Sequence, residues 1–109
     1  MTAVAPPVKT ENWSTLILDH PSSFSVTITS DMSLAVVSIC QASGFGSVLD
    51  ASSGGVVRMV GARGDGIEEA FARALMSQIG TQRVILTLAL RCSSPQMFRD
   101  LLLEIKKFQ

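Results

Sequence analysis

The sequence predicts an α+β domain in which a six-stranded, mostly antiparallel sheet carries two helices on one face. Two observations predict this class. Residues 15–60 consist of short apolar or alternating segments separated by turn residues, which is the pattern of consecutive strands. Residues 65–109 contain two segments with apolar residues at helical spacing, on either side of one further strand. The expected order is therefore β-β-β-β-β-α-β-α.

Five strands are expected before the first helix. In residues 24–29, Phe, Val and Ile alternate with Ser and Thr, as in a half-buried strand, and Asp31 marks the hairpin turn that follows. The nearly continuous apolar run 34–40 is typical of a strand covered on both faces. The other expected strands are 15–18, a segment around 47–50, and 56–60, and a turn is expected at 20–23.

The second half of the chain predicts two helices around a strand. Asp65 is a good N-cap for the first helix, and Gly80 ends it. The run 83–90 is a second strand apolar on both faces. Ser94 caps the last helix, with Pro95 at its first position. The apolar faces of the two helices are Ile67, Ala70, Phe71, Ala74, Leu75 and Ile79, and Met97, Phe98, Leu101, Leu102, Ile105 and Phe108.

The 109 residues are enough for one domain with its own core. Residues 1–12 contain a Pro-Pro pair and no apolar period, so we expect a flexible tail there and a single α+β domain over 13–109.

Two helices can cover only one face of such a sheet, which predicts an assembly. If alternate residues of the last strand meet the helices, the others form a second, small and weakly polar face that suits stacking against another sheet. We therefore expect a dimer with sheets inside and helices outside, formed with itself or with a second small protein. The candidate interface residues are Ser25, Thr27, Ile85, Thr87 and Ala89.

The charge pattern argues against a nucleic-acid partner. Nine basic residues are balanced by nine acidic ones, whereas nucleic-acid binders carry a net basic surface. The balance hides an asymmetry: residues 1–57 have one base and four acids, a net of −3, and residues 58–109 have eight bases and five acids, a net of +3. This asymmetry is equally typical of ordinary scatter on solvated helices and of two unlike faces that meet a protein partner.

The sequence also indicates a cellular setting. Cys40 and Cys92 belong to no pair of metal-ligand spacing, and we expect them to be thiols in a reducing compartment. No apolar run has the roughly 20 residues of a membrane helix, nor is a signal peptide expected. We expect no membrane association and a location in the cytoplasm, and in the nucleus as a second site.

No residue pattern predicts catalysis, a cofactor or a metal site. The glycines of residues 61–66 precede a helix, but no Lys-Ser/Thr pair follows them, and the nearby acids would repel a phosphate. His20 is the only histidine and has no partner at a catalytic spacing. Glu68 and Glu69 are adjacent on a helix, so their carboxylates diverge. We expect a protein that is not an enzyme.

The helices offer candidate contacts for a partner protein. Met76 and Leu103 fall outside the apolar stripes of their helices, and basic residues lie near them. The candidates are Arg73, Met76, Arg99, Leu103, Lys106 and Lys107.

The order and lengths of these segments resemble a known family. The apolar run 34–40 closes in a Gly-containing turn and a short strand at 44–49, and an apolar strand ends at Gly61. An amphipathic helix with Phe71-Ala72-Arg73, the strand 83–90 and a terminal helix with Leu-Leu-Leu-Glu-Ile at 101–105 follow. Residues 33–109 thereby resemble the small proteasome assembly chaperones of the third and fourth type.

The resemblance implies a function. Members of that family have a six-stranded antiparallel sheet with helices, pair as a heterodimer of the two types, and help α-type subunits of the 20S proteasome form their ring. They are not enzymes and need no nucleotide. The segment between Asp50 and Val56 departs from the third type, in which a longer loop is typical, so the resemblance leaves the type open.

Two other classes remain open at this stage. A small roadblock-like or profilin-like adaptor scaffold shares the size and the absence of catalytic residues, but such scaffolds usually place a helix before the first strand. The second alternative is an enzyme that binds phosphate through residues 61–66.

Overall fold

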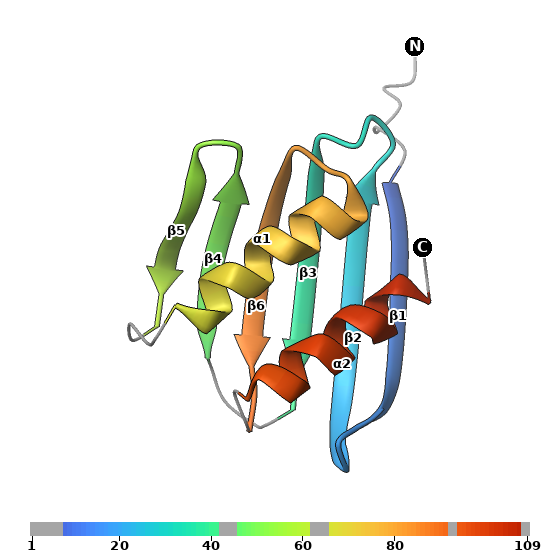
Figure 1. Cartoon of the computed structure of the whole chain (residues 1–109). Coiled ribbons are helices and arrows are strands. Elements are labelled where there is room, and N and C mark those ends of the chain that lie inside the picture. The colour runs from blue at the N-terminus through green and yellow to red at the C-terminus, as the bar shows by residue number, and fades with distance from the viewer. Residues whose placement is uncertain (1–7, 42–45, 62–65, 92–93, 108–109) are drawn as a thin grey trace.

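A computed structural model of the chain describes residues 8–41, 46–61, 66–91 and 94–107 (Figure 1). It contains a six-stranded mixed sheet and two helices in the C-terminal half, which confirms the predicted α+β class and element order. Both helices lie on the same face of the sheet. The elements are β1 (Val8–Ile17), β2 (His20–Thr29), β3 (Leu34–Cys40), β4 (Ser47–Ser52), β5 (Gly55–Val60), α1 (Ile67–Ile79), β6 (Arg83–Ala89) and α2 (Pro95–Lys106).

The strand order is β1-β2-β3-β6-β4-β5. All neighbours pair antiparallel except β3 and β6, which are parallel and occupy the centre of the sheet. These two strands are the runs that the sequence predicted to be covered on both faces. In the single chain the helices cover one face only, and on the other face Val36 is exposed. The parallel pairing needs a long crossover, which β4, β5 and α1 provide.

The core lies between the sheet and the two helices. Alternate residues of β3 and β6, such as Val37, Ile39 and Leu86, are fully buried because they point toward the helices. The predicted helical stripes supply the other side of the core through Phe71 and Phe98, whose ring centroids are 4.9 Å apart. Packing of these complementary faces fixes α1 and α2 on one side of the sheet.

The helix ends follow the predicted signals with one exception. The Ser94 hydroxyl accepts a hydrogen bond from the backbone N–H of Met97 at 3.2 Å, and Gly80 closes α1 in the left-handed conformation. The predicted N-cap of α1 was one residue too early: the helix is preceded by Gly66, with φ of 87° and no side-chain cap. Asp65 lies outside the described residues.

The first strand begins earlier than predicted. β1 starts at Val8, so the flexible tail cannot extend to residue 12 as expected. Residues 9–12 are polar and show no apolar period, yet their backbone pairs in register with β2, from Lys9 with Ile28 to Asn12 with Ser25. Backbone pairing at a sheet edge does not require apolar side chains, which is why the sequence pattern did not reveal it. Residues 1–7 are outside the described part.

The first hairpin turn also lies earlier than predicted. β2 already begins at His20, so residues 20–23 are not a turn. The chain reverses at Leu18 and Asp19, whose φ angles are 48° and 66°. Two residues with positive φ match the tight turn that the right-handed twist of paired strands favours, but this turn normally selects Asn-Gly or Asp-Gly. Leucine is an unusual choice that the sequence pattern did not signal.

Replacing Leu18 by asparagine is expected to stabilise the fold by about 1 kcal/mol, because a left-handed conformation costs an ordinary residue roughly 1–2 kcal/mol and costs asparagine less. The free energy of unfolding in urea measures the effect. Leu16→Asn is the control, since Leu16 is also an exposed leucine but lies in regular β1. Equal stabilities of the two variants would contradict the assignment of strain to this turn.

Candidate protein-interaction site

No described helix covers the second face of the sheet, which we call the open face (Figure 1). The predicted dimer-interface residues lie on it, because they alternate with the buried residues of the same strands. The strand register places Thr27 and Ile85 on either side of Val36, and Ser25 and Thr87 on either side of Ser38. Ala89 pairs with Cys40 one row further along. The five residues therefore form one surface across β2, β3 and β6.

The open face has a polar and an apolar part. On β1 and β2 the hydroxyls of Thr10 and Thr27 are hydrogen bonded at 3.1 Å, and those of Ser14 and Ser23 at 3.3 Å. Toward the opposite edge, exposed apolar side chains take their place. Val36, Val57 and Met59 are 41%, 65% and 60% exposed. We call these three residues the apolar patch.

Sequence reasoning missed Val57 and Met59, although both belong to a strand that was predicted. Residues 56–60 are apolar except at position 58, so alternation alone did not separate an inner from an outer face. The deciding feature is Arg58, whose side chain turns toward α1 and so sends its two neighbours to the open face. A charged residue that points inward is difficult to recognise without its partners.

An ion pair divides the apolar patch, because the strand register places Asp50 between Ile85 and Val57, and Ile85 next to Val36. Arg83 Nε donates to one carboxylate oxygen of Asp50 at 2.9 Å, and its Nη2 donates to the other at 2.6 Å. The hydrogen bond from Arg83 holds the pKa of the Asp50 carboxyl below its usual value. The Arg83 side chain is 53% exposed, so the pair is largely solvated in the single chain. If a second sheet stacks on this face, the charges of Asp50 and Arg83 already compensate each other.

The Asp50 carboxylate gives the fold a pH dependence. Because its pKa is lower in the folded than in the unfolded chain, its contribution to stability is complete above the unfolded pKa of about 3.9 and is lost as the pH falls through the folded pKa. We expect Asp50→Asn to reduce the loss of unfolding free energy between neutral and strongly acidic pH. Urea titrations at several pH values measure it. An unchanged pH profile in Asp50→Asn would contradict this role of the pair.

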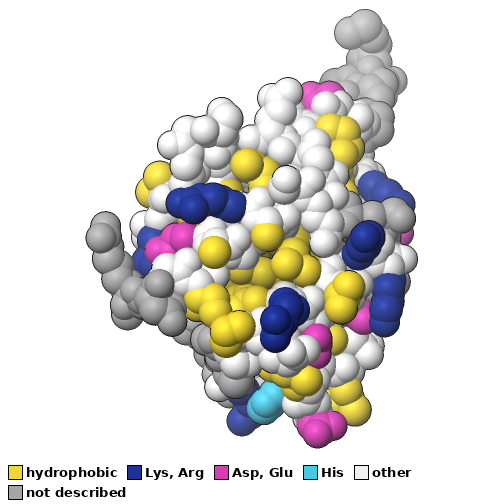
Figure 2. Space-filling model, in the orientation of Figure 1, with side chains coloured by type: hydrophobic (Ala, Val, Ile, Leu, Met, Phe, Trp, Pro, Cys, Tyr) yellow, Lys and Arg dark blue, Asp and Glu magenta, His cyan; other side chains and the backbone are white. Residues whose placement is uncertain are grey.

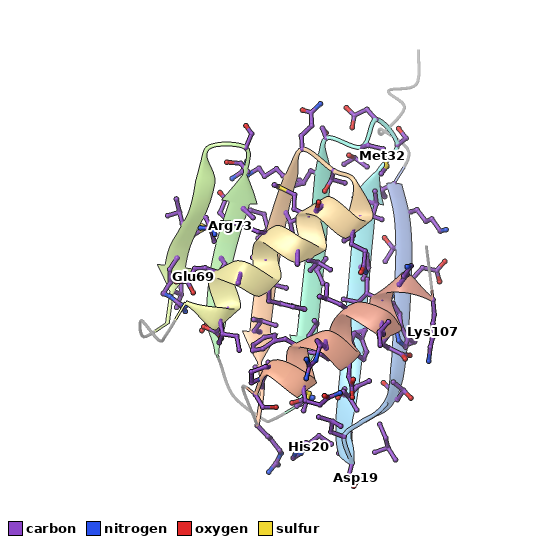
Figure 3. The ribbon with its side chains drawn as sticks, viewed as in Figure 1. Asp19, His20, Met32, Glu69, Arg73 and Lys107 are labelled. Atoms are coloured by element: carbon purple, nitrogen blue, oxygen red, sulfur yellow. The ribbon has the colours of Figure 1, made fainter. Side chains whose placement is uncertain are left out.

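The predicted partner contacts on the helices do not form one site. Figure 2 shows basic side chains spread over the helical side of the molecule. Arg73 lies on α1, whereas Lys107 lies far from it at the end of α2 (Figure 3). Arg99 donates to Gln96 at 2.8 Å, and Lys107 pairs with Glu104 at 3.1 Å. The helices thus present separate basic groups rather than a continuous patch.

The two apolar candidates on the helices differ in exposure. Met76 is half-buried and packs against the core, so much of its side chain is unavailable to a partner. Helical spacing alone placed Met76 outside the apolar stripe of α1. Spacing along a helix does not show how far the sheet extends beneath it. Leu103 is 61% exposed, as a partner contact requires.

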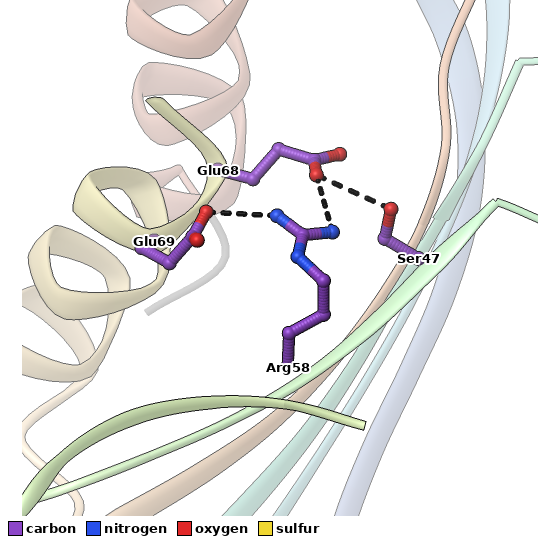
Figure 4. A network of polar contacts seen from close by, with 4 residues as sticks. All are labelled: Ser47, Arg58, Glu68 and Glu69. Carbon is purple, nitrogen blue, oxygen red and sulfur yellow. Dashed lines mark hydrogen bonds and ion pairs between the residues drawn. The ribbon is translucent and has the colours of Figure 1, made fainter. Parts of the chain in front are cut away.

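The first turn of α1 is fixed to β5 by a buried arginine that the sequence pattern did not reveal (Figure 4). Arg58 contacts Glu68 and Glu69 at 2.8 Å each, and its side chain is only 9% exposed. The Ser47 hydroxyl donates to Glu68 at 3.2 Å. The hydrogen bond to Glu68 raises the pKa of Arg58. Arg58 therefore does not contribute to the basic surface expected of residues 58–109.

The described residues contain no further chemical site of the kinds considered in the sequence. No group of three or more His, Cys, Asp or Glu side chains within the described ranges is placed to hold a metal ion. His20 is half-buried at the start of β2, and Cys40 is exposed at the end of β3. Residues 62–65 of the glycine-containing segment and Cys92 lie outside the described part. Neither of the two described helices has the length and hydrophobicity needed to cross a membrane.

Comparison with known proteins adds no assignment: no protein-family model matches the chain, and no curated protein matches it significantly.

Proposed function

We propose that this protein is a non-enzymatic assembly chaperone that dimerises through the open face and assists α-ring formation of the 20S proteasome by binding α-type subunits. The observation that carries the proposal is the apolar patch, since burying exposed apolar side chains of an uncovered sheet face beneath a second sheet gains stability. We infer the client, an α-type proteasome subunit, from the resemblance of residues 33–109 to the third and fourth chaperone types. The proposed locations are the cytoplasm and the nucleus.

The mixed composition of the open face supports pairing with one defined partner. Exposed apolar side chains provide the driving force, while the hydroxyl rows require complementary groups opposite them and the charges of Asp50 and Arg83 are already paired with each other. A second copy or a second small chaperone of the same fold satisfies this requirement. The client is then held on the helical side, which stays accessible in such a dimer. A later subunit that claims the same surface would release the chaperone.

A capture experiment with purified α-type proteasome subunits tests the client assignment. The wild-type protein is expected to retain an α-type subunit on a column. Reversing the charges of Arg73, Arg99, Lys106 and Lys107 together is expected to weaken capture, because these basic groups are exposed on the helices. Circular dichroism of the variant controls for folding. Unchanged capture by a folded variant would contradict the electrostatic contact.

An adaptor scaffold of the roadblock-like or profilin-like class is the alternative. It would also dimerise, but it would organise other proteins and capture no α-type subunit. The same experiment therefore separates the two functions.

A further inference from the structure

A groove with a volume of about 520 Å³ lies where the end of the β1–β2 hairpin meets α2. Three exposed leucines line it: Leu16, Leu18 and Leu103 are 65%, 43% and 61% exposed. Leu103 comes from the outer side of α2, and the other two come from the hairpin. Exposed leucines from elements far apart in sequence thus line one groove, and such groups mark contact sites more often than scattered leucines do.

The groove continues around the edge of the sheet. Leu16 and Ile17 are successive residues of β1, so their side chains point to opposite faces, and their exposed fractions of 65% and 6% reflect this. A groove lined by both residues must pass around the outer edge of β1. This shape fits an extended chain, whose side chains also point alternately to the two faces.

The edge beside the groove is open to strand addition. β1 is the outermost strand, and among the described strands it pairs only with β2. Its outward backbone groups can therefore pair with an added strand. Charged side chains usually protect such an edge, and β1 has two, Lys9 and Glu11, in its first half. Residues 12–17, next to the groove, carry no charge.

The rim of the groove carries two acids, Asp100 and Glu104, and two bases, Lys106 and Lys107. Glu104 accepts from both Trp13 Nε1 and Lys107, and Asp100 accepts from the neutral amide of Gln96 at 2.8 Å. Lys106 also lines the groove, is exposed and forms no ion pair within the described part of the chain. A carboxylate on a bound segment could form an ion pair with Lys106.

We infer that the outer edge of β1 and this groove dock an extended segment of a partner protein. The segment adds as a strand to β1, places one apolar side chain against Leu103 on the helical face and the next against Leu16 on the open face, and pairs an acidic residue with Lys106. The inference deepens the proposed function and rests on it only for the identity of the partner, which would be the client subunit.

Selection from a displayed library of random short peptides on the purified full chain tests the inference. The enriched peptides are expected to combine β-branched or aromatic residues with an acidic residue. Their binding, followed by fluorescence anisotropy, is expected to weaken about tenfold in Leu103→Ser and about fivefold in Lys106→Glu, with a smaller salt dependence in the latter. Val60→Ser, at an exposed apolar residue of β5 outside the apolar patch, is the matched control and is expected to bind normally. Hydrogen exchange of β1 amides is expected to slow when peptide binds.

Four results would overturn the inference. They are a selection that enriches no peptide, enriched peptides that are mainly basic, equal peptide binding by folded Leu103→Ser and wild type, and a dimer that dissociates on Leu103→Lys, which would assign the groove to a second copy. Because the selection uses no proteasome subunit, its failure leaves α-subunit capture intact, and a failed capture leaves peptide binding intact.

Discussion

Replacing both Val57 and Met59 by glutamate is expected to convert a dimer into monomers. The two side chains are 65% and 60% exposed in the single chain, and stacking of open faces would bury them. Burial of one such side chain is worth roughly 1.5–3 kcal/mol, and each glutamate would bring an unpaired charge into the interface. We expect the dissociation constant to rise by at least about 100-fold. Light scattering over a range of protein concentrations measures the change.

Leu103→Glu is the control for this experiment. Leu103 is 61% exposed, about as much as Val57 and Met59, but it lies on the helical side of the molecule. The dimer is expected to survive this change. A wild-type protein that is monomeric at micromolar concentration, or equal dissociation of both variants, would contradict an interface on the open face.

Replacing Arg58 by methionine is expected to destabilise the fold by about 3 kcal/mol, because removal of one partner from a buried ion pair leaves the other charges uncompensated. Arg58 is 9% exposed and contacts two carboxylates at 2.8 Å, which remain 19% and 26% exposed. Without the guanidinium, Glu68 and Glu69 would repel each other beside β5. Urea denaturation of the monomeric Val57→Glu/Met59→Glu protein measures the loss.

Arg83→Met on the same background is the matched comparison. Arg83 also binds a carboxylate through two hydrogen bonds, but its side chain is 53% exposed. A solvated ion pair is worth less than about 1 kcal/mol, so this variant is expected to lose much less stability. Equal losses for the two arginines would show that burial does not decide the strength of these pairs.

The fold class could be predicted because the central elements have strong local patterns. The continuous apolar runs of β3 and β6 became the two central strands. Most of the predicted stripes of α1 and α2 face the core, although Ala70 and Ala74 are exposed. Ser94 caps the start of α2 and Gly80 caps the end of α1 as expected, since caps depend on neighbouring backbone groups. These features depend on residues close together in sequence, so local sequence patterns predict them.

The features that the sequence did not predict depend mostly on contacts between distant residues. The first half of β1 is polar and is held by backbone pairing with β2, and the turn at Leu18 and Asp19 contains a leucine that no turn rule selects. The candidate site was predicted in part for the same reason. Alternation on β2 and β6 identified the open face, whereas the exposure of Val57 and Met59 follows from the inward turn of Arg58 toward α1. That turn depends on two glutamates from the next element.

Affinity purification of the tagged chain from its own cells, followed by native mass spectrometry of the eluted complex, tests the proposed function most directly. We expect the 11.6 kDa chain to be recovered with a second small chain or a second copy of itself, together with α-type proteasome subunits. The Val57→Glu/Met59→Glu variant is expected to lose the small partner. Recovery of the chain as a monomer, or of a dimer without any α-type subunit, would contradict the proposal.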